Sequence, residues 1–352
     1  MTPPEIVIGT RKVGLQHPPL IIAEMSGNHN QSLERALALV ESAAAAGAHA
    51  LKLQTYTADT MTLDVDAGEF RIDDQDSLWA GKSLYDLYKE AHTPWDWHKP
   101  IFDRARELGL LAFSTPFDDS AVDFLEGLNA PCYKIASFEN TDLRLIRRVA
   151  RTGKPVIVST GMATAQEIAE AVAAIRSENN DDIILLRCVS AYPASPDEAN
   201  LLTIPDMRAR FGCQVGLSDH TMGVGVAAAS VGLGGTVIEK HFTLRRADGG
   251  VDSAFSLEPE ELKALVEESE RAWLARGEVH YGPVASEQAS LQFRRSLYVV
   301  ADVKAGDLFS TSNVRAIRPG LGLSPKHVDA VLGRRARMDV ARGTPLSWDL
   351  LQ

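Results

Sequence analysis

Residues 155–188, PVIVSTGMATAQEIAEAVAAIRSENNDDIILLRC, contain the unit that decides the fold. A short apolar run at 155–160 is followed by a stretch with apolar residues three and four positions apart, and then by a second apolar run at 183–188. Short apolar runs that alternate with amphipathic helices are typical of βα units around a parallel sheet. The stretch therefore predicts two buried parallel strands joined by a helix over 165–177.

The same unit repeats along the chain from Pro19 onward. Eight strand–helix pairs in about 260 residues favour a (β/α)₈ TIM barrel over an open sheet, because about 250 residues is the usual length of this α/β fold. The other six predicted strands are 19–25, 49–55, 110–115, 132–137, 213–218 and 236–242, and further amphipathic stretches include 32–46, 139–151 and 258–275.

Two regions depart from this repeat. The connection over 56–93 is far longer than an ordinary βα loop, which predicts an ordered lid or substrate loop with a short helix near LYDLYKE, or else a decorative insertion. After a barrel domain over 1–276, short strand signals and many turns predict a linker at 277–290 and a small domain at 291–352. So small a domain is expected to dock on the barrel or on a partner chain.

Composition excludes several classes of protein. Acidic residues outnumber basic ones 47 to 36, for a net charge of −11, and there is no run of basic residues to bind nucleic acid. There is no long uncharged apolar stretch, so we expect no membrane span or signal peptide and a cytoplasmic location. The three cysteines, Cys132, Cys188 and Cys213, lack CxxC spacing and are expected to be buried, reduced thiols.

Polar residues follow the predicted strands at their carboxyl ends, where barrels of this type carry their catalytic groups. They are Glu24, Lys52, Gln54, Ser114, Thr115, Lys134, Ser137, Glu139, Ser159, Thr160, Gly161, Ser190, Tyr192, Ser218, Asp219, His220, Glu239, Lys240 and His241.

Two of these residues, Lys52 and Lys134, lie inside apolar strands. Burying an ammonium group costs several kcal/mol unless an anion pairs with it, so both lysines predict a bound anion. An internal pair with Glu24 or Glu139 is the alternative. Backbone N–H groups of the turn STGMAT could complete a phosphate or carboxylate cradle, together with the hydroxyl groups of Ser137, Ser159 and Ser218.

His220 and His241 end neighbouring predicted strands, so their imidazoles can converge. Two histidines with water and a substrate oxygen suit an open Mn²⁺, Mg²⁺ or Zn²⁺ site. A hydrogen bond to a neighbour or to substrate is the simpler role for a histidine in this position.

Several motifs resemble those of the sialic acid synthase family. They are IIAEMSGNHNQSLERAL (21–37), AGAHALKLQTYTADTMTL (46–63), FSTPFD (113–118), YKIASFE (133–139), STGMAT (159–164), GLSDHT (216–221) and EKHFT (239–243). The segments RRSLYV (294–299) and IRPGLG (317–322) resemble that family's antifreeze-like (SAF) domain. Within the family, SGNHNQ and LKLQTYTADTMTL look most like the pseudaminate branch.

The resemblance implies condensation of phosphoenolpyruvate (PEP) with an open-chain N-acetylated amino sugar, giving a nonulosonic acid and phosphate. For the pseudaminate branch the sugar is 2,4-diacetamido-2,4,6-trideoxy-L-altrose, and neuraminate or legionaminate synthesis is the alternative. A divalent metal (Mn²⁺, Mg²⁺ or Co²⁺) polarises the aldehyde while C3 of PEP attacks, and water captures the cationic C2 before the C–O bond to phosphate breaks. A barrel glycoside hydrolase, the rival from another class, has no use for two buried lysines.

Roles for individual residues follow from the resemblance. The implied PEP ligands are Lys52, Thr115, Lys134, Ser137, Ser159, Ser218 and Ser190, the last standing where neuraminate enzymes have Asn. His220 and His241 are the implied metal ligands. Glu24 and Asp252 would bind the sugar and move protons, and Gln54, Glu139 and Tyr192 would hold its polar edge. The family also implies a domain-swapped homodimer in which Arg318 of one chain reaches the sugar in the other.

Overall fold

The computed structural model describes residues 3–74 and 77–352. The chain divides into two compact units, Met1–Gly277 and Glu278–Gln352. The barrel and linker limits expected at 276 and 290 stay predictions, and the helix η6 (Ala285–Phe293) overlaps the expected linker.

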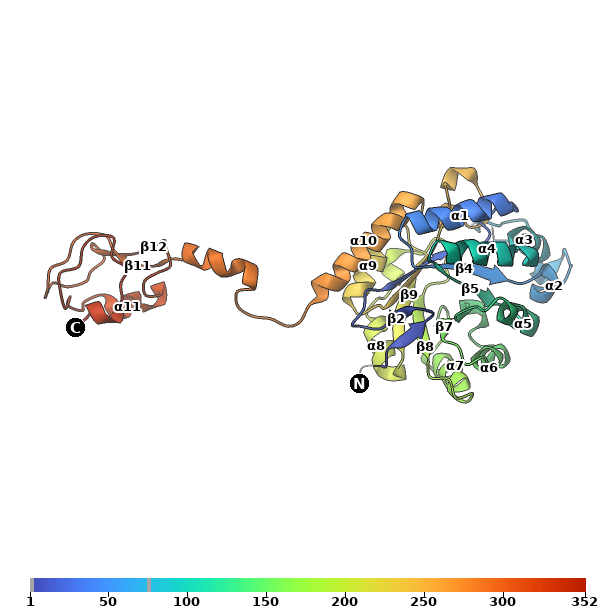
Figure 1. The fold of residues 1–352 in the computed structure, drawn as a ribbon, viewed down its shortest axis with the longest axis horizontal. Helices are drawn as coiled ribbons and strands as arrows, with labels where there is room; N and C mark the ends of the chain where they lie inside the picture. The colour runs from blue at the N-terminus through green and yellow to red at the C-terminus, as the bar shows by residue number, and fades with distance from the viewer. Residues whose placement is uncertain (1–2, 75–76) are drawn as a thin grey trace. The chain divides into compact units, whose positions relative to one another are not determined.

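Eight parallel strands close a barrel in the first unit, as predicted, and their order is β10-β3-β4-β5-β6-β7-β8-β9 (Figure 1). Each strand coincides with one of the eight apolar runs of the sequence. The strands are β3 (Leu20–Glu24), β4 (Ala50–Thr55), β5 (Leu111–Pro116), β6 (Tyr133–Ile135), β7 (Val156–Ser159), β8 (Ile183–Cys188), β9 (Gln214–Ser218) and β10 (Val237–His241).

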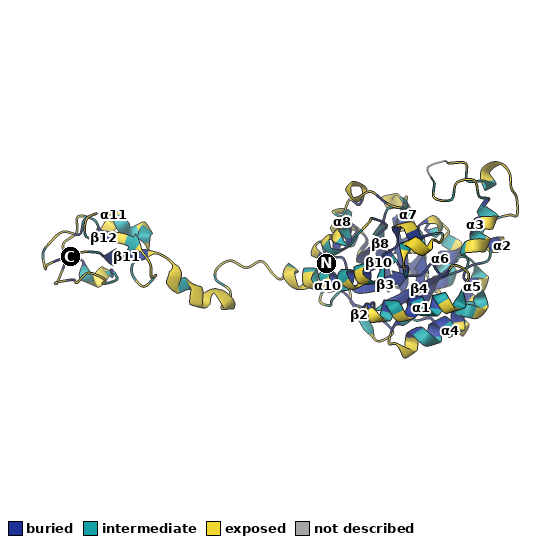
Figure 2. Ribbon diagram, turned by 90° about the horizontal axis from the view of Figure 1, so that it is seen from above, coloured by how far each residue is buried: buried dark blue, intermediate teal, exposed yellow. Residues whose placement is uncertain are grey.

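Helices surround these strands, and Figure 2 shows buried strands inside a ring of helices with exposed outer faces. The 165–177 helix predicted first is α7, which begins after Thr164 because the Thr164 and Glu167 side chains form a capping box. The ring contains α1 (Leu33–Ala45), α4 (Trp95–Glu107), α5 (Asp119–Gly127), α6 (Leu143–Ala150), α7 (Ala165–Arg176), α8 (Thr203–Phe211), α9 (Gly225–Gly232) and α10 (Pro259–Arg276).

A hairpin that the sequence analysis did not predict precedes the barrel. Its strands β1 (Ile6–Ile8) and β2 (Arg11–Val13) pair antiparallel. Ile6, Ile8 and Val13 belong to the same buried cluster as inward-facing barrel residues such as Leu20 and Ile157. The hairpin therefore closes the amino-terminal end of the barrel with apolar side chains.

The long connection after β4 is ordered where it is described, and we call residues 56–93 the insertion. It contains α2 (Ala58–Met61), the short helix η1 (Gly68–Phe70) and α3 (Leu84–Ala91), and α3 is the helix predicted near LYDLYKE.

The C-terminal unit is built around a small core of its own. Strands β11 (Ser296–Val299) and β12 (Val314–Ile317) pair antiparallel, and α11 (Val328–Val331) packs beside them. Neither this unit nor the described part of the barrel contains a helix long and apolar enough to cross a membrane.

Candidate active site

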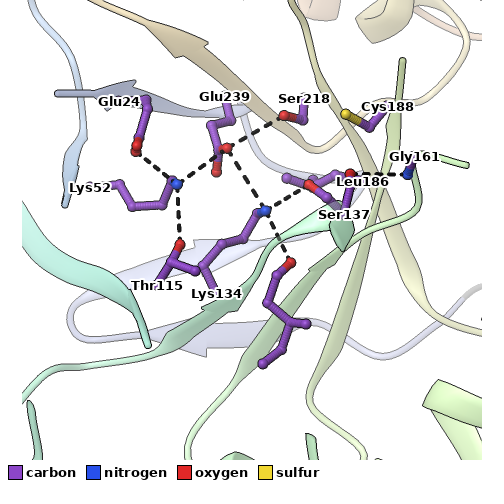
Figure 3. A network of polar contacts seen from close by, with 12 residues as sticks. Glu24, Lys52, Thr115, Lys134, Ser137, Gly161, Leu186, Cys188, Ser218 and Glu239 are labelled. Carbon is purple, nitrogen blue, oxygen red and sulfur yellow. Dashed lines mark hydrogen bonds and ion pairs between the residues drawn. The ribbon is translucent and has the colours of Figure 1, made fainter. Parts of the chain in front are cut away.

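Several polar side chains point into the barrel interior at its carboxyl end. Side chains alternate between the two faces of a strand, so residues two positions apart point the same way. Ile22 and Ile157 lie in the interior apolar cluster, so the residues two positions later on the same strands, Glu24 and Ser159, also face inward. The register places Glu24 beside Lys52. The network drawn in Figure 3 brings together Glu24, Lys52, Thr115, Lys134, Ser137, Ser218 and Glu239.

Lys52 is at the centre of this network and is 3% exposed. Its Nζ lies 2.8 Å from Glu24 and 3.5 Å from Glu239. It also donates a hydrogen bond to Thr115 Oγ1 at 3.2 Å. Burial lowers the pKa of Lys52, but Glu239 and Glu24 outweigh burial, so the net shift is upward and the ammonium form is stabilised.

Lys134 is buried on the neighbouring side of Glu239. Its Nζ donates to Ser159 Oγ at 2.6 Å and to the Ile135 carbonyl at 3.1 Å, and lies 3.9 Å from Glu239. Burial lowers the pKa of Lys134, and Glu239 only partly offsets this. The internal Lys–Glu pairing raised as an alternative is therefore present, with Glu24 and Glu239 as the carboxylates in place of Glu139.

A small cradle lies beside Lys134, in the turn after β7. The Gly161 N–H donates to Ser137 Oγ at 3.1 Å (Figure 3). A Cβ atom at Gly161 would lie 2.3 Å from Ser190 Oγ and 2.6 Å from Ser137 Oγ. Ser190 Oγ is buried without a hydrogen-bond partner in the described chain. Two hydroxyl groups thus converge where only glycine fits, and the Gly161 N–H holds one of them in place. Both hydroxyl groups can donate to phosphate or carboxylate oxygens.

The two predicted metal ligands also converge, since the ring centroids of His220 and His241 are 5.4 Å apart. Nδ1 of His220 lies 2.8 Å from the Val189 carbonyl, which can only accept, so this nitrogen carries the proton and leaves Nε2 with its lone pair. Nδ1 of His241 is buried without a hydrogen-bond partner among described residues and lies 3.8 Å from Asp252 Oδ2.

This arrangement fits a divalent metal. Burial and the positive charge of nearby groups, from His220 when it carries a second proton and from the lysines, lower the pKa of His241 well below its ordinary value, so its ring is neutral and able to coordinate. Over residues 3–74 and 77–352 no three or more His, Cys, Asp or Glu side chains group as a metal shell. A metal held by the two histidines would keep coordination positions for water and a substrate oxygen.

A cavity of about 390 Å³ opens above these groups and contains the residues expected to bind the sugar. Asp252 accepts a short hydrogen bond from Ser26 Oγ, and Gln54 Nε2 donates to Glu24 at 3.0 Å. The Tyr192 ring lies 4.5 Å from the His220 ring. The predicted residues that line the cavity are Gln54, Glu139, Tyr192, His241 and Asp252.

Comparison with known proteins places this site in a family. The NeuB family model matches residues 39–281, and the SAF domain model matches residues 294–352. The chain belongs to the NeuB family. Its sequence is 44% identical over 94% of its length to a pseudaminic acid synthase of Helicobacter pylori, of which 97% is covered. It is 42% identical over 93% of its length to a pseudaminic acid synthase of Campylobacter jejuni, of which 94% is covered.

Solved structures agree with the barrel assignment. The N-acetylneuraminic acid synthetase of Leptospira borgpetersenii matches with a TM-score of 0.73 at 33% identity, over 83% of this chain and 97% of that chain. The fold class predicted from the sequence is confirmed.

Three parts of this NeuB-family site had no role assigned from the sequence. Glu239, which contacts both buried lysines, could have been recognised because it precedes His241 by two positions and so shares its face of the strand. Lys240 points to the outside of the barrel, where its Nζ lies 2.8 Å from Asp219. Asp219 directly precedes His220 and Lys240 directly precedes His241, so this buried ion pair joins the chain beside one histidine to the chain beside the other. Asn28, in SGNHNQ, donates to the Phe242 carbonyl at 2.9 Å and fixes the loop after β3.

Arg318 lies in the C-terminal unit, at the residue after β12, and is exposed. Its predicted contact with the sugar stays a prediction, as do the individual ligand roles of the barrel residues.

Three carboxyl groups around the cavity have raised pKa values. Burial raises the pKa of Glu24, and Lys52 only partly offsets this effect. Burial likewise raises the pKa of Asp252, against the hydrogen bond from Ser26. Glu139 reaches a pKa of about 7 through burial, with Lys134 opposing. Of the three, Glu139 is able to hold a proton near neutral pH.

We expect the Glu139→Gln variant to gain stability over the wild type as pH rises. The folded pKa of Glu139, about 7, lies above its ordinary value of 4.5, so the stability linked to the protonated carboxyl is fully present below about 4.5 and is lost through 7. Thermal unfolding at about pH 5 and about pH 8.5 should show the larger gain at the higher pH.

Glu178→Gln is a control of opposite sign, because Arg151 lowers the pKa of Glu178. The assignment fails if Glu139→Gln shows the same difference from wild type at both values.

Proposed function

We propose that this chain condenses PEP with 2,4-diacetamido-2,4,6-trideoxy-L-altrose to give pseudaminic acid and phosphate. The observation that supports the reaction type is a set of buried groups suited to an anion: the two lysines and, beside Lys134, an unpartnered serine hydroxyl in a turn where only glycine fits. Identities of 42–44% over more than nine-tenths of the chain with two pseudaminic acid synthases support the choice of sugar. Neuraminate or legionaminate synthesis is the alternative.

In this proposal, the lysines and the cradle hold PEP. Lys52 and Lys134 bind its negative groups, and Ser137 and Ser190 donate hydroxyl hydrogens to phosphate oxygens, with further contacts from Thr115, Ser159 and Ser218. Without PEP, the two lysines are balanced by Glu24 and Glu239. Binding of PEP adds negative charge, and Glu24, whose pKa is already raised by burial, is the carboxyl group placed to take up a compensating proton.

The sugar then occupies the cavity above, with its aldehyde toward the histidines. Nε2 of His220 and Nδ1 of His241 would hold a divalent metal, which supplies Lewis acidity to the aldehyde when bound. C3 of PEP attacks the aldehyde carbon, and the sugar oxygen takes the proton held by Glu24. Asp252 and Glu24 hold the water that captures the resulting cationic C2, and Glu24, now a carboxylate, accepts its proton, while Gln54, Glu139 and Tyr192 orient the sugar. Tetrahedral collapse then breaks the C–O bond and releases phosphate.

Release of phosphate tests the proposal. We expect the purified protein to release phosphate from PEP only when an amino sugar and Mn²⁺, Mg²⁺ or Co²⁺ are both present. EDTA should stop turnover, and addition of any one of these three metal ions should restore it. Comparing the altrose, N-acetylmannosamine and legionaminate-type precursors identifies the sugar.

Full activity of His220→Ala or His241→Ala after exhaustive chelation would contradict the metal assignment. Absence of phosphate release with every sugar would contradict the reaction. A barrel glycoside hydrolase would instead cleave glycosides without PEP, and it would have no use for two buried lysines.

We also infer that the enzyme works as a homodimer in which Arg318 of one chain reaches the sugar in the other. An Arg318→Ala chain and a Lys52→Met chain should each be inactive, but their mixture should regain part of the activity. One of the two active sites in the mixed dimer then has both an intact barrel and an intact Arg318. Truncation near Tyr281 should leave a folded barrel with little activity, since the barrel has its own core.

Subunit exchange must be verified with mass-tagged chains, because a dimer that never exchanges also shows no rescue. Exchange of subunits without any recovery of activity would indicate that Arg318 acts on the barrel of its own chain.

A further inference from the structure

Described residues of the insertion (residues 56–93) supply much of the lining of the sugar cavity. These lining residues are almost all apolar, and only tyrosine hydroxyls interrupt this surface. We call it the apolar wall, made up of Met61, Ile72, Trp79, Leu84, Leu87 and Tyr88.

Apart from these tyrosine hydroxyls, the polar groups that line the same cavity come from outside the insertion. They lie at the carboxyl ends of the strands and in the loops after them, and include Ser26, Gln54, Glu139, His241 and Asp252. In the proposed function the aldehyde carbon reacts among these polar groups, near His241. An open-chain sugar is extended, so its far end, C5 and C6, is directed away from the strand ends and toward the apolar wall.

The apolar wall is held in place without substrate. Ile72 exchanges backbone hydrogen bonds with the far arm of its loop, donating to the Lys82 carbonyl at 3.0 Å and accepting from the Gly81 N–H at 2.8 Å. Trp79 Nε1 donates to the Val251 carbonyl at 2.8 Å, which fastens the wall beside Asp252. The indole N–H is thereby used, so Trp79 presents no free donor to a ligand.

We propose that Ile72 and Leu84 of the apolar wall are specificity-determining residues that select amino sugars with a methyl group at C6 over sugars with a hydroxymethyl group there. This inference rests on the proposed function and adds to it the residues that recognise the deoxygenated carbon. Neither side chain can hydrogen-bond a C6 hydroxyl, which would lose its water without gaining a partner. A pocket of this kind rejects an added hydroxyl by about tenfold to a hundredfold.

The experiment compares two substrates that differ at this one carbon. They are 2,4-diacetamido-2,4,6-trideoxy-L-altrose and 2,4-diacetamido-2,4-dideoxy-L-altrose, each with PEP. The wild type should favour the first by about tenfold or more in kcat/KM. Ile72→Thr and Leu84→Asn should each lower this ratio at least threefold, chiefly by losing activity on the deoxy sugar, with KM for PEP unchanged.

Leu78→Asn is the matched control. Leu78 belongs to the same loop but is 49% exposed and does not line the cavity, so its ratio should equal that of the wild type. Thermal unfolding identifies any variant that fails to fold. If one of the two wall variants does not fold, the substrate ratio of the other wall variant tests the inference. Equal kcat/KM for the two sugars in the wild type, or an unchanged ratio in a folded wall variant, overturns this inference alone. Absence of phosphate release with both sugars overturns the proposed function together with it.

Discussion

Replacing Gly161 with alanine is expected to abolish detectable PEP binding. The new Cβ would meet Ser190 Oγ at 2.3 Å and Ser137 Oγ at 2.6 Å, far inside van der Waals contact. Both serines can escape only by turning their hydroxyl groups out of the cradle, which also removes the hydrogen bond from the Gly161 N–H. The loss of two or three hydrogen bonds to a charged ligand, each about 1.5–3 kcal/mol, amounts to a hundredfold or more in affinity.

Calorimetric titration with PEP measures this effect directly. Gly127→Ala is the control, because nothing lies within 4 Å of a Cβ atom at that position, near the end of α5. The double variant Gly161→Ala/Ser190→Ala relieves the closest contact and should recover part of the binding. Wild-type affinity in the single variant would exclude this cradle as the phosphate site.

The second large effect is expected from Glu239→Gln. The carboxylate of Glu239 lies 3.5 Å from Lys52 Nζ and 3.9 Å from Lys134 Nζ, and all three side chains are buried. Removing one partner of a buried ion pair costs about 3–5 kcal/mol, because the remaining charge stays out of water without compensation. The free energy of unfolding should fall by about this amount.

Added anions should reverse much of that loss. Phosphate or PEP binds the folded state only, so it can replace the missing carboxylate and stabilise the variant by mass action. The increase in melting temperature with phosphate should therefore be larger in Glu239→Gln than in the wild type. Glu178→Gln, which breaks the surface pair with Arg151, should change the free energy of unfolding little and show no added response to anions. An equal response in Glu239→Gln and the wild type would argue against an anion site at these lysines.

The barrel could be predicted from the sequence because each strand is buried on both faces and therefore appears as a continuous apolar run. The hairpin β1–β2 could not, since strands of three residues, IVI and RKV, are too short to show a period. Its burial depends on the barrel interior that it covers, which is a tertiary effect.

The site was predictable where the alternation of side chains along one strand decides it, as for Lys52, Lys134 and His241. The role of Glu239 was missed because it depends on closure of the barrel, which brings β10 beside β3 and so toward Lys52 on β4. The contact between Gly161 and Ser190 joins two loops after different strands, and their approach follows from strand register, which local sequence does not encode. The apolar wall depends on how the insertion folds back over the strand ends.

The closed amino-terminal end of the barrel has a consequence for the order of events in turnover. Beneath the buried lysines lie mainly apolar side chains, including those of the β1–β2 hairpin, and the amide of Gln214, which donates to the Pro4 carbonyl at 2.8 Å. Gln54 lines the cavity two residues beyond Lys52 on the same strand. In the proposed function, the sugar therefore occupies the layer above the anion. The barrel interior is thus a blind channel with one entrance at its carboxyl end. The ligand of the lower layer must therefore bind first and be released last, which gives the enzyme a compulsory order of substrate binding.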